Sequence, residues 1–342
     1  MTIPNVKIAV QDGALGILPE NTDNLHVKLG VSAGGAPNQI YSFNSLKEAK
    51  DVLLRGPLLE AVAHALAVAG GPVLAVPVMP SVAGAAGVIT KSGAGPTVTV
   101  AGAPVDGFEV IVEILKQGPL ATGTFRFSLD GGDTWSPEIT LPSGGTYVLP
   151  ETGLTLTFPA GAYIAGETYT FSCTAPGYSS TDLTNAMNAL LADPRTWAFV
   201  HVVGAPASGA AAATLAGVLA SLMTQAETAH RYAFALLDGP DEADNALVSA
   251  FAAFASTRVA IGAGYEELTS AITGRVHKRP SAWVTAARAA RVPMHEDLGR
   301  VASGPVPGVT KLYRDEQVTP ALDAARFCTL RTIVGRQGFY VT

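Results

Sequence analysis

The sequence contains little charge. Asp, Glu, Lys and Arg make up 15% of its 342 residues, the net charge is -6 at pH 7, and hydrophobic residues reach 48%. Lys and Arg form no block, so the basic surface that nucleic-acid binding requires is not expected. A surface with so few charges is typical of a chain that is covered by further copies of itself, because obligate interfaces resemble protein cores. The composition therefore predicts a homo-oligomer that does not bind nucleic acid.

Cysteine is scarce and long apolar runs are missing. The two cysteines, Cys173 and Cys328, have no framework spacing, which argues against a disulfide scaffold and suits a reducing cytoplasm. No run of about 18 uninterrupted apolar residues occurs. The richest stretch, residues 209–226, includes Thr, Ser and Gln and is predicted to be an amphipathic helix. The start, MTIPNVKIAV, lacks the basic and apolar regions of a signal peptide. We expect synthesis in the cytoplasm and no membrane insertion.

Sequence motifs of enzymes are missing too. There is no Walker A sequence and no G-x-S-x-G elbow, and the six histidines have no His or Cys partner at metal-ligand spacing. Gly262 and Gly264 follow a predicted strand, but the third Gly of a dinucleotide fingerprint is absent. A plain turn is the favoured interpretation there, and a nucleotide-dependent enzyme is the alternative. The sequence predicts no catalytic, cofactor or metal site and a protein that is not an enzyme.

Strands and helices alternate in two separate stretches of the chain. The first holds an apolar strand, a helix that breaks at Gly56-Pro57, a second helix and another strand. In the second, apolar strands alternate with helices, and a last helix is expected at 317–327. This order predicts an α/β core, a mainly parallel sheet with flanking helices. The predicted core covers residues 23–84 and 177–328.

Residues 85–176 follow a different pattern, without a helical period. Apolar residues alternate in short runs, such as the one from Phe108 to Ile114, and clusters of Gly, Pro, Ser and Asp separate the runs. This pattern predicts a small antiparallel β-sandwich or barrel. An insertion into the α/β core is the simplest interpretation, and it predicts that the two junctions lie close in space. Tandem domains are the alternative, although the first α/β piece could not then bury its sheet alone.

The segment SLDGGDTW matches the Asp-box pattern Ser-x-Asp-x-Gly-x-Thr-Trp. A hairpin turn explains the pattern, because the carboxylate accepts bonds from turn amides, the glycines permit the backbone, and the Trp packs beneath. We interpret the box as structural; a carbohydrate-binding or glycosidase-like module is the alternative. Its residues are Ser128, Asp130, Gly132, Thr134 and Trp135.

The sequence begins and ends with short β segments set off by breakers, VKIAV and TLRTIVGRQGFYVT. A strand whose N–H and C=O groups lack a partner pairs with another chain. We therefore expect arms at residues 1–22 and 329–342 that have no partner in their own chain and pair with neighbouring subunits. The candidate inter-subunit residues are Val6, Ile8, Val10, Ile333, Phe339, Tyr340 and Val341.

Basic residues are concentrated between residues 275 and 291 of an otherwise acidic chain. Two interpretations are open: a solvated helix face, and a docking face for an acidic partner. The residues are Arg275, Lys278, Arg279, Arg288 and Arg291.

These features resemble the contractile tail sheath proteins of bacteriophages and related injection systems. The last part, LDAARFCTLRTIVGRQGFYVT, is similar to the sheath C-terminal region, in which a helix leads into an Arg-containing strand and a Gly-aromatic terminal strand. The stretch ALGILPENTDNLHVKLGVSAGGAPNQIYSF resembles the start of the phage sheath-like group. Sheath proteins also carry a β domain inserted into an α/β core. In residue detail the resemblance is confined to residues 5–45 and 320–342.

The resemblance implies a function in a virion tail sheath. Subunits would form a helix or stacked rings around a tail tube, linked by their arms, and a baseplate trigger would let them repack and drive the tube through a cell envelope. The implied partners are further copies of the chain, the tail tube protein, and baseplate and tail terminator proteins, with no cofactor. The β domain would face outward, and the basic segment or the helix near residues 317–330 would face the tube. The candidate hinges in the arms are Gly13, Gly16, Gly335 and Gly338.

Overall fold

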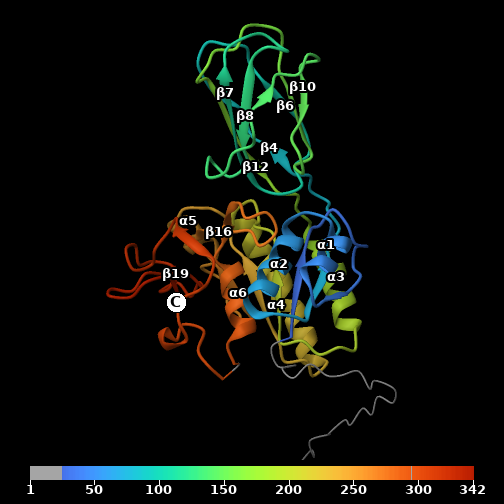
Figure 1. The fold of residues 1–342 in the computed structure, drawn as a ribbon. Helices are drawn as coiled ribbons and strands as arrows, with labels where there is room; N and C mark the ends of the chain where they lie inside the picture. Colours follow the sequence, from blue (N-terminus) through green and yellow to red (C-terminus); the bar gives the residue numbers. More distant parts are fainter. Residues whose placement is uncertain (1–24, 294) are drawn as a thin grey trace, which may run out of the picture.

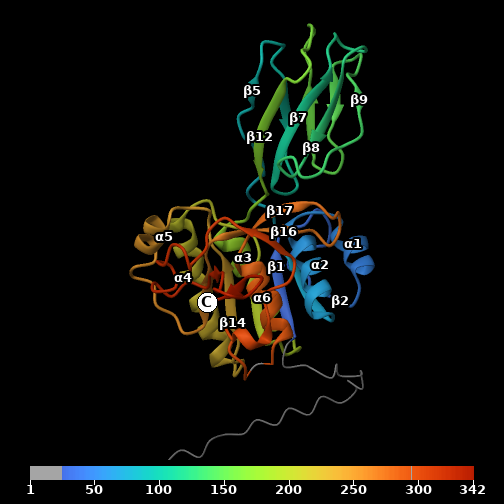
Figure 2. The same ribbon diagram turned by 60° about the vertical axis from the view of Figure 1, so that its left-hand side comes forward.

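The computed structural model describes residues 25–293 and 295–342, which form two bodies (Figure 1). A body of strands, residues 85–174, stands on one side of a larger body of helices and strands; we call them the β body and the α/β body. Figure 2 shows the same separation from another side. The predictions for Val6, Ile8, Val10, Gly13 and Gly16 lie outside the described residues.

A six-stranded mixed sheet forms the centre of the α/β body. Five strands run parallel in the order β15-β14-β13-β1-β3, and β2 pairs antiparallel with β3 at one edge. Both faces are covered, so the strands are almost continuously apolar, as a mainly parallel sheet requires. The strands are β1 His26–Gly30, β2 Tyr41–Phe43, β3 Val73–Pro77, β13 Phe199–Val202, β14 Phe234–Asp238 and β15 Val259–Gly262.

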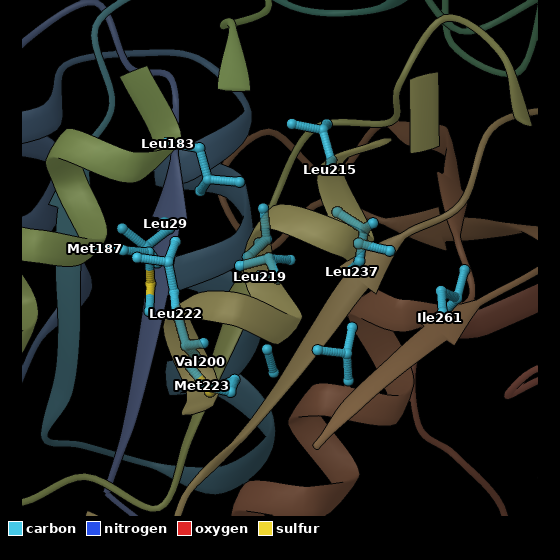
Figure 3. Close-up of a cluster of buried hydrophobic side chains, with 14 of the residues drawn as sticks. Leu29, Leu183, Met187, Val200, Leu215, Leu219, Leu222, Met223, Leu237 and Ile261 are labelled. Carbon is cyan, nitrogen blue, oxygen red and sulfur yellow. The ribbon is translucent and has the colours of Figure 1, made fainter. Parts of the chain in front are cut away.

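Helices cover both faces of this sheet. On one face α3 and α4 place Met187 and Leu219 against Val27 and Leu29 of β1 in the main hydrophobic cluster (Figure 3). On the other face lie α2 and α6, with α1 beside α2. Side chains alternate along a strand, so Lys28 faces the α2 and α6 layer. The helices are α1 Leu46–Leu53, α2 Pro57–Ala69, α3 Ser180–Ala192, α4 Gly209–Thr228, α5 Asp244–Ala250 and α6 Ala282–Arg291.

Local sequence sets the helix ends. At the start of α3, Ser179 Oγ accepts a hydrogen bond from Asp182 N–H at 3.2 Å, and Asp182 Oδ2 accepts one from Ser179 N–H at 2.9 Å, which completes a capping box. The predicted helix break at Gly56-Pro57 is confirmed. Gly56 has a φ of 108°, which favours glycine, and Pro57 is the first residue of α2, where its missing N–H is not needed.

Among the described helices, α4 alone is long and apolar enough to cross a membrane by composition. A helix buried in a protein core has the same composition. Leu215, Leu222 and Met223 of α4 are buried against the sheet, while Thr214 and Ser221 are exposed. The predicted amphipathic helix at 209–226 is confirmed.

Two antiparallel sheets form the β body and enclose a core of their own. One has the order β4-β12-β7-β8-β9, with β5 also paired to β12, and the other has the order β10-β11-β6. The alternating apolar residues, among them Phe108, Val112, Phe125, Leu154 and Tyr169, point into this core. Two sheets that share one core form a sandwich. The strands are β4 Ala85–Ala86, β5 Thr90–Ser92, β6 Thr99–Gly102, β7 Phe108–Lys116, β8 Thr124–Ser128, β9 Ile139–Thr140, β10 Thr146–Val148, β11 Leu154–Thr157 and β12 Thr168–Thr174.

Two stretches of chain connect the bodies, and they lie side by side. Val82 and Gly177 exchange two backbone hydrogen bonds of 3.1 Å and 2.8 Å. Ser81 Oγ also accepts a hydrogen bond from Ser179 N–H at 2.9 Å. The predicted closeness of the two junctions is confirmed, which is what an insertion requires.

A small antiparallel sheet and a short hairpin complete the α/β body. In the sheet, β16 lies between β17 and β18, so β18 is an edge strand. In the hairpin, β19 pairs with β20. The bounds are β16 Tyr265–Thr269, β17 Val276–Pro280, β18 Val309–Leu312, β19 Leu330–Arg331 and β20 Tyr340–Val341, and a 3-10 helix covers Val301–Ser303.

The helix predicted at 317–327 is wrong: turns occupy this range. Pro320 lacks the N–H that a helix interior needs. Glu316 Oε1 accepts hydrogen bonds from the N–H groups of Ala321 at 2.8 Å and Asp323 at 3.0 Å, so a side chain takes amides that a helix would have bonded to its own carbonyls.

We predict that truncating the buried face of α4 weakens the fold. Leu219 is fully buried in the main cluster, so Leu219→Ala should lower the free energy of unfolding by about 2–5 kcal/mol, because contacts are lost and a cavity remains. Ser221 lies on the exposed side of the same helix, and Ser221→Ala should change that free energy by less than about 0.5 kcal/mol. Urea denaturation followed by circular dichroism measures both. Equal effects would contradict the packing of α4.

Candidate functional site

A cleft of about 1030 Å³ lies between the two bodies. Its lining from the α/β body includes Gly204 after β13 and Asp238 at the end of β14, and its lining from the β body includes Glu109 and Asp130. The strand order reverses between β1 and β13, and ligands of parallel sheets bind outside the carboxyl ends of the strands at such a point. The cleft is therefore the first place to test for chemistry.

A chain of buried polar groups crosses the sheet beside the cleft. Lys28 Nζ lies 3.0 Å from His201 Nδ1, and His201 Nε2 lies 2.9 Å from Asp238 Oδ1. Asp238 Oδ2 accepts hydrogen bonds from Trp283 Nε1 at 3.0 Å and from Gly204 N–H at 2.9 Å. Lys28 and His201 are partners in the register of β1 and β13. The chain of contacts joins β1, β13, β14 and α6.

Burial sets the protonation of these groups. Desolvation lowers the pKa of Lys28 to about 7, against the opposing charge of Asp238. Desolvation, and then the neighbouring Lys28, lower the pKa of His201 to about 4, so the ring is neutral at pH 7. Its Nε2–H then donates to Asp238, and its Nδ1 accepts from Lys28. Desolvation and the charges of Lys28 and His201 lower the pKa of His64 to about 3, and His64 Nε2 has no hydrogen-bond partner among the described residues.

The polar network of Lys28, His201 and Asp238 has the residue types of a catalytic relay but not its geometry. A base or nucleophile must reach its substrate, but Lys28 and His201 are 1% and 0% exposed. Asp238 borders the cleft, yet both of its carboxylate oxygens already accept hydrogen bonds. Within the described ranges, no three His, Cys, Asp or Glu side chains are grouped to hold a metal ion. The geometry supports a structural network that fixes three strands and a helix to one another.

Two residues of the basic segment are buried. Arg279 donates from Nη1 and Nη2 to Asp106 Oδ1 and Oδ2, both at 2.8 Å, and the two side chains are 8% and 7% exposed. Arg288 donates to the carbonyl oxygens of Leu298 at 2.5 Å and Gly304 at 2.8 Å. The structure contradicts the prediction that Arg279 and Arg288 face a tube, because their charged groups bind partners inside the chain.

The other three basic residues lie nearer the surface. Lys278 is half-buried, is paired with Asp241 and lies 4.8 Å from the ring centre of Tyr313. Arg275 is half-buried, and Arg291 is exposed at the end of α6. A docking face in this segment is thus limited to Arg275, Lys278 and Arg291.

The Asp-box forms a turn after β8. Asp130 Oδ1 accepts hydrogen bonds from the Ser128 hydroxyl at 2.7 Å and from Thr134 N–H at 2.9 Å, and its Oδ2 accepts one from the Thr134 hydroxyl at 2.6 Å. Burial opposes ionisation of Asp130, but these hydrogen bonds outweigh it and hold the pKa of the carboxyl below its usual value. Gly132, with a φ of 108°, donates its N–H to Ser128 Oγ, and the Trp135 ring lies 4.2 Å from the Arg126 guanidinium. Because the turn uses its own polar atoms, this geometry supports a structural role.

The N-terminal end of α6 fills the space beside Gly262, the last residue of β15. A Cβ at Gly262 would lie 2.5 Å from Ala282 N, so the glycine lets the start of α6 approach the strand closely. That approach fills the space that a phosphate would need beside Gly262. The nucleotide alternative finds no support here.

The last strand has a partner in its own chain. In the β19–β20 pair, Leu330 lies opposite Val341 and Arg331 opposite Tyr340. Tyr340 and Val341 are 4% and 3% exposed. The prediction that this strand has no partner in its own chain is wrong, because it pairs antiparallel with β19 of the same chain.

The loop between β19 and β20 is more exposed than the strands. Val334 is 89% exposed, while Ile333 and Phe339 are half-buried. Gly335 and Gly338 have φ values of 77° and 86°, which favour glycine. A Cβ at Gly338 would lie 2.6 Å from Cβ of Pro305. These glycines shape the loop in the chain as it stands, and their use as hinges remains a prediction.

Sequence reasoning missed Lys28, Asp106 and Asp238. Signals existed for two of them: Lys28 is a single charge in the apolar strand HVKLG, and Asp238 ends the strand FALLD at the edge where parallel sheets place functional groups. Asp106 lies 173 residues from Arg279, and no local pattern marks such a pair.

We predict that His64 makes the fold sensitive to acid. Its pKa is about 3 in the folded chain and near the ordinary 6.5 in the unfolded chain, so unfolding takes up a proton between these values and the free energy of unfolding falls as the pH falls. His64→Leu removes this uptake and should flatten the dependence by up to about 1.4 kcal/mol per pH unit. The control is His230→Asn at an exposed position, which should keep the wild-type slope. Urea denaturation at several pH values decides; an unchanged slope in His64→Leu would contradict the burial of this ring.

The solved structures similar to this chain include two sheath tail proteins, and no curated protein matches the chain. The sheath tail protein of Desulfitobacterium hafniense is 12% identical, with a TM-score of 0.46 over 98% of this chain and 74% of its own. The sheath tail protein of Listeria innocua is 12% identical, with a TM-score of 0.45 over 92% of this chain and 67% of its own.

A family model covers nearly the whole chain. It is described as DUF2586, N-terminal domain, and it matches residues 3–342. The description names no activity. The chain belongs to the DUF2586 family.

Proposed function

We propose that the protein is a structural subunit of a contractile tail sheath in a virion tail. It polymerises around a tail tube through strands exchanged between subunits, and it shortens to drive the tube through a cell envelope. Its partners are further copies of itself, the tail tube protein, and baseplate and tail terminator proteins. The observation that carries the proposal is the last hairpin, β19–β20, a short strand pair whose loop exposes Val334.

The hairpin and a turn bound to it place apolar side chains in solvent. Val334 in the hairpin loop is 89% exposed, and Val318 in the turn is 77% exposed. Asp315 ties the turn to the hairpin, because its carboxylate accepts hydrogen bonds from the N–H and the hydroxyl of Thr332 at 2.9 Å and 2.5 Å. We take these two exposed side chains as candidate contacts with another protein.

The strand pair of the hairpin is weak enough to exchange. Each strand has two residues, and a backbone hydrogen bond contributes only about 0.5–1.5 kcal/mol. Burial of Tyr340 and Val341 adds about 1.5–3 kcal/mol each. A neighbour that offers an equivalent strand edge replaces these contacts, and many such links in one lattice hold together strongly.

The edge strand β18 is our candidate acceptor. It pairs only with β16 among the described strands, and its Thr310 and Lys311 are exposed. An edge strand with free N–H and C=O groups pairs with an added strand unless something blocks it. The proposal thus places a donor and an acceptor on one subunit, as a repeating lattice requires.

The carbohydrate-binding or glycosidase-like alternative has less support. It depends on the Asp-box, whose Asp130 carboxylate already bonds to Ser128 and Thr134 of the same turn. A group that is held in this way is not presented to a sugar.

We predict that a charge in place of Val334 blocks assembly. The wild-type protein should form tubes, rings or polysheaths in negative-stain electron microscopy, and Val334→Lys should remain in small species, because a charge would be buried in the contact. The matched control is Val88→Lys, which alters a residue that is 92% exposed on the β body and should assemble like the wild type. Normal assembly of Val334→Lys would remove the hairpin loop from the interface.

Deleting residues 332–342 tests the donated strand itself. We expect soluble small species, because the deletion removes β20 and the loop together. Size-exclusion chromatography with light scattering gives the mass, and circular dichroism shows whether the sheet is retained. A folded deletion variant that assembles normally would contradict strand exchange.

A further inference from the structure

The two bodies touch through few specific contacts. Two stretches of chain join them, bridged at Val82 and Gly177. Among the described residues, the hydrogen bonds between the β body and the α/β body are the two that Arg279 donates to Asp106. Next to this pair, Phe108 meets His277 edge to face, with ring centres 6.3 Å apart. One buried ion pair therefore dominates the polar contact between the bodies.

Arg279 is held in place from the side of the α/β body. It lies on β17, opposite Glu266 of β16 in the strand register. Its guanidinium lies 4.7 Å from the ring centre of Trp283, and the Trp283 Nε1–H donates to Asp238 in the polar network of the central sheet. Contacts within the α/β body thus orient the Arg279 guanidinium, which suits a bidentate bond to the Asp106 carboxylate.

Asp106 is also fixed, on the side of the β body. It lies in the loop between β6 and β7, and its Oδ1 accepts a hydrogen bond from Gly107 N–H at 2.7 Å. The bonds from Arg279 and Gly107 outweigh the cost of burial and hold the pKa of Asp106 below its usual value, so the pair is ionic at neutral pH.

A cleft lies beside this ion pair, between the two bodies. The cleft of about 1030 Å³ is lined by residues of both bodies, including Glu109 and Asp130 on one side and Asp241 and Tyr313 on the other. Two bodies whose polar contact is one buried pair beside a cleft have room to turn relative to each other once the pair is broken.

We propose that the Arg279–Asp106 pair is a latch that sets the orientation of the β body, and that breaking the latch frees the β body to swing on its two connecting stretches. A second carboxyl group, that of Glu60, also interacts electrostatically with the Arg279 guanidinium. Glu60 of α2 is close enough for its charge to act on Arg279, and it accepts a hydrogen bond from the Ser270 hydroxyl at 2.7 Å. An unpaired buried charge is costly, and the charge of Glu60 reduces that cost for Arg279 when Asp106 is withdrawn. This inference does not depend on the tail sheath function.

The latch is tested by measuring the distance between the bodies. Spin labels on cysteines introduced for Val148 in the β body and Val318 in the α/β body report it, since both positions are exposed. The native Cys173 is buried and Cys328 is half-buried, and burial raises the pKa of both thiols, so brief labelling near neutral pH favours the introduced ones. Dilution with unlabelled protein restricts the measurement to distances within one chain, whether or not the protein assembles.

The variants are Asp106→Ala and the double variant Asp106→Ala/Arg279→Met, which removes both charges of the pair. The control, Glu113→Gln, breaks the pair of Glu113 with Arg126 inside the β body. The wild type and the control should give one narrow distance distribution. Both latch variants should give a broad one, and proteases should cut the two connecting stretches on the order of tenfold faster or more.

A folded double variant with the wild-type distribution and cleavage rate would overturn the latch, even if Asp106→Ala alone fails to fold. Loss of the α/β fold in both variants would also overturn the latch. The Arg279–Asp106 pair would then stabilise the fold of the α/β body rather than set the orientation of the β body. Failure of the wild type to assemble would bear on the proposed function and leave the latch intact.

Discussion

The carboxylate of Asp238 is the acceptor on which the α/β body depends. It ends β14 and takes hydrogen bonds from His201 on β13, from the backbone of Gly204 and from Trp283 on α6. Through His201 it reaches Lys28 in the centre of the sheet. A buried carboxylate is tolerated only when such donors surround it. The same donors fix the strands and the helix in one arrangement, so the polar groups at the carboxyl edge of the sheet serve structure rather than chemistry.

A series of contacts leads from this edge of the sheet to the β body. Trp283, held by Asp238, lies against Arg279, and Arg279 reaches across to Asp106. The position of the β body thus depends on a line of contacts that begins in the central sheet. Where parallel sheets commonly bind ligands, this chain has a joint between two bodies. A joint of this kind suits a subunit that changes the arrangement of its parts within an assembly.

The fold could be predicted from the sequence wherever a local pattern determined it. Alternation from Phe108 to Ile114 required a strand with one buried face, and Gly56-Pro57 required a break between two helices. The helix at 317–327 could not be judged in this way, because the Glu316 side chain captures amides that propensity alone would assign to a helix. The same limit applied to the basic segment: composition placed Arg279 on a surface, and only a carboxylate far away in the chain explains its burial.

The last hairpin joins the structure of one subunit to its proposed assembly. Its two strands pair within one chain and its loop exposes Val334, so the hairpin is formed in one subunit and offers an apolar side chain to the next. The most direct test is an electron cryo-microscopy map of the purified, assembled protein that resolves the interface between subunits. We predict that residues 339–341 lie along a strand of a neighbouring subunit. A map in which the subunits meet elsewhere, or a protein that stays monomeric at high concentration, would contradict a sheath built by strand exchange.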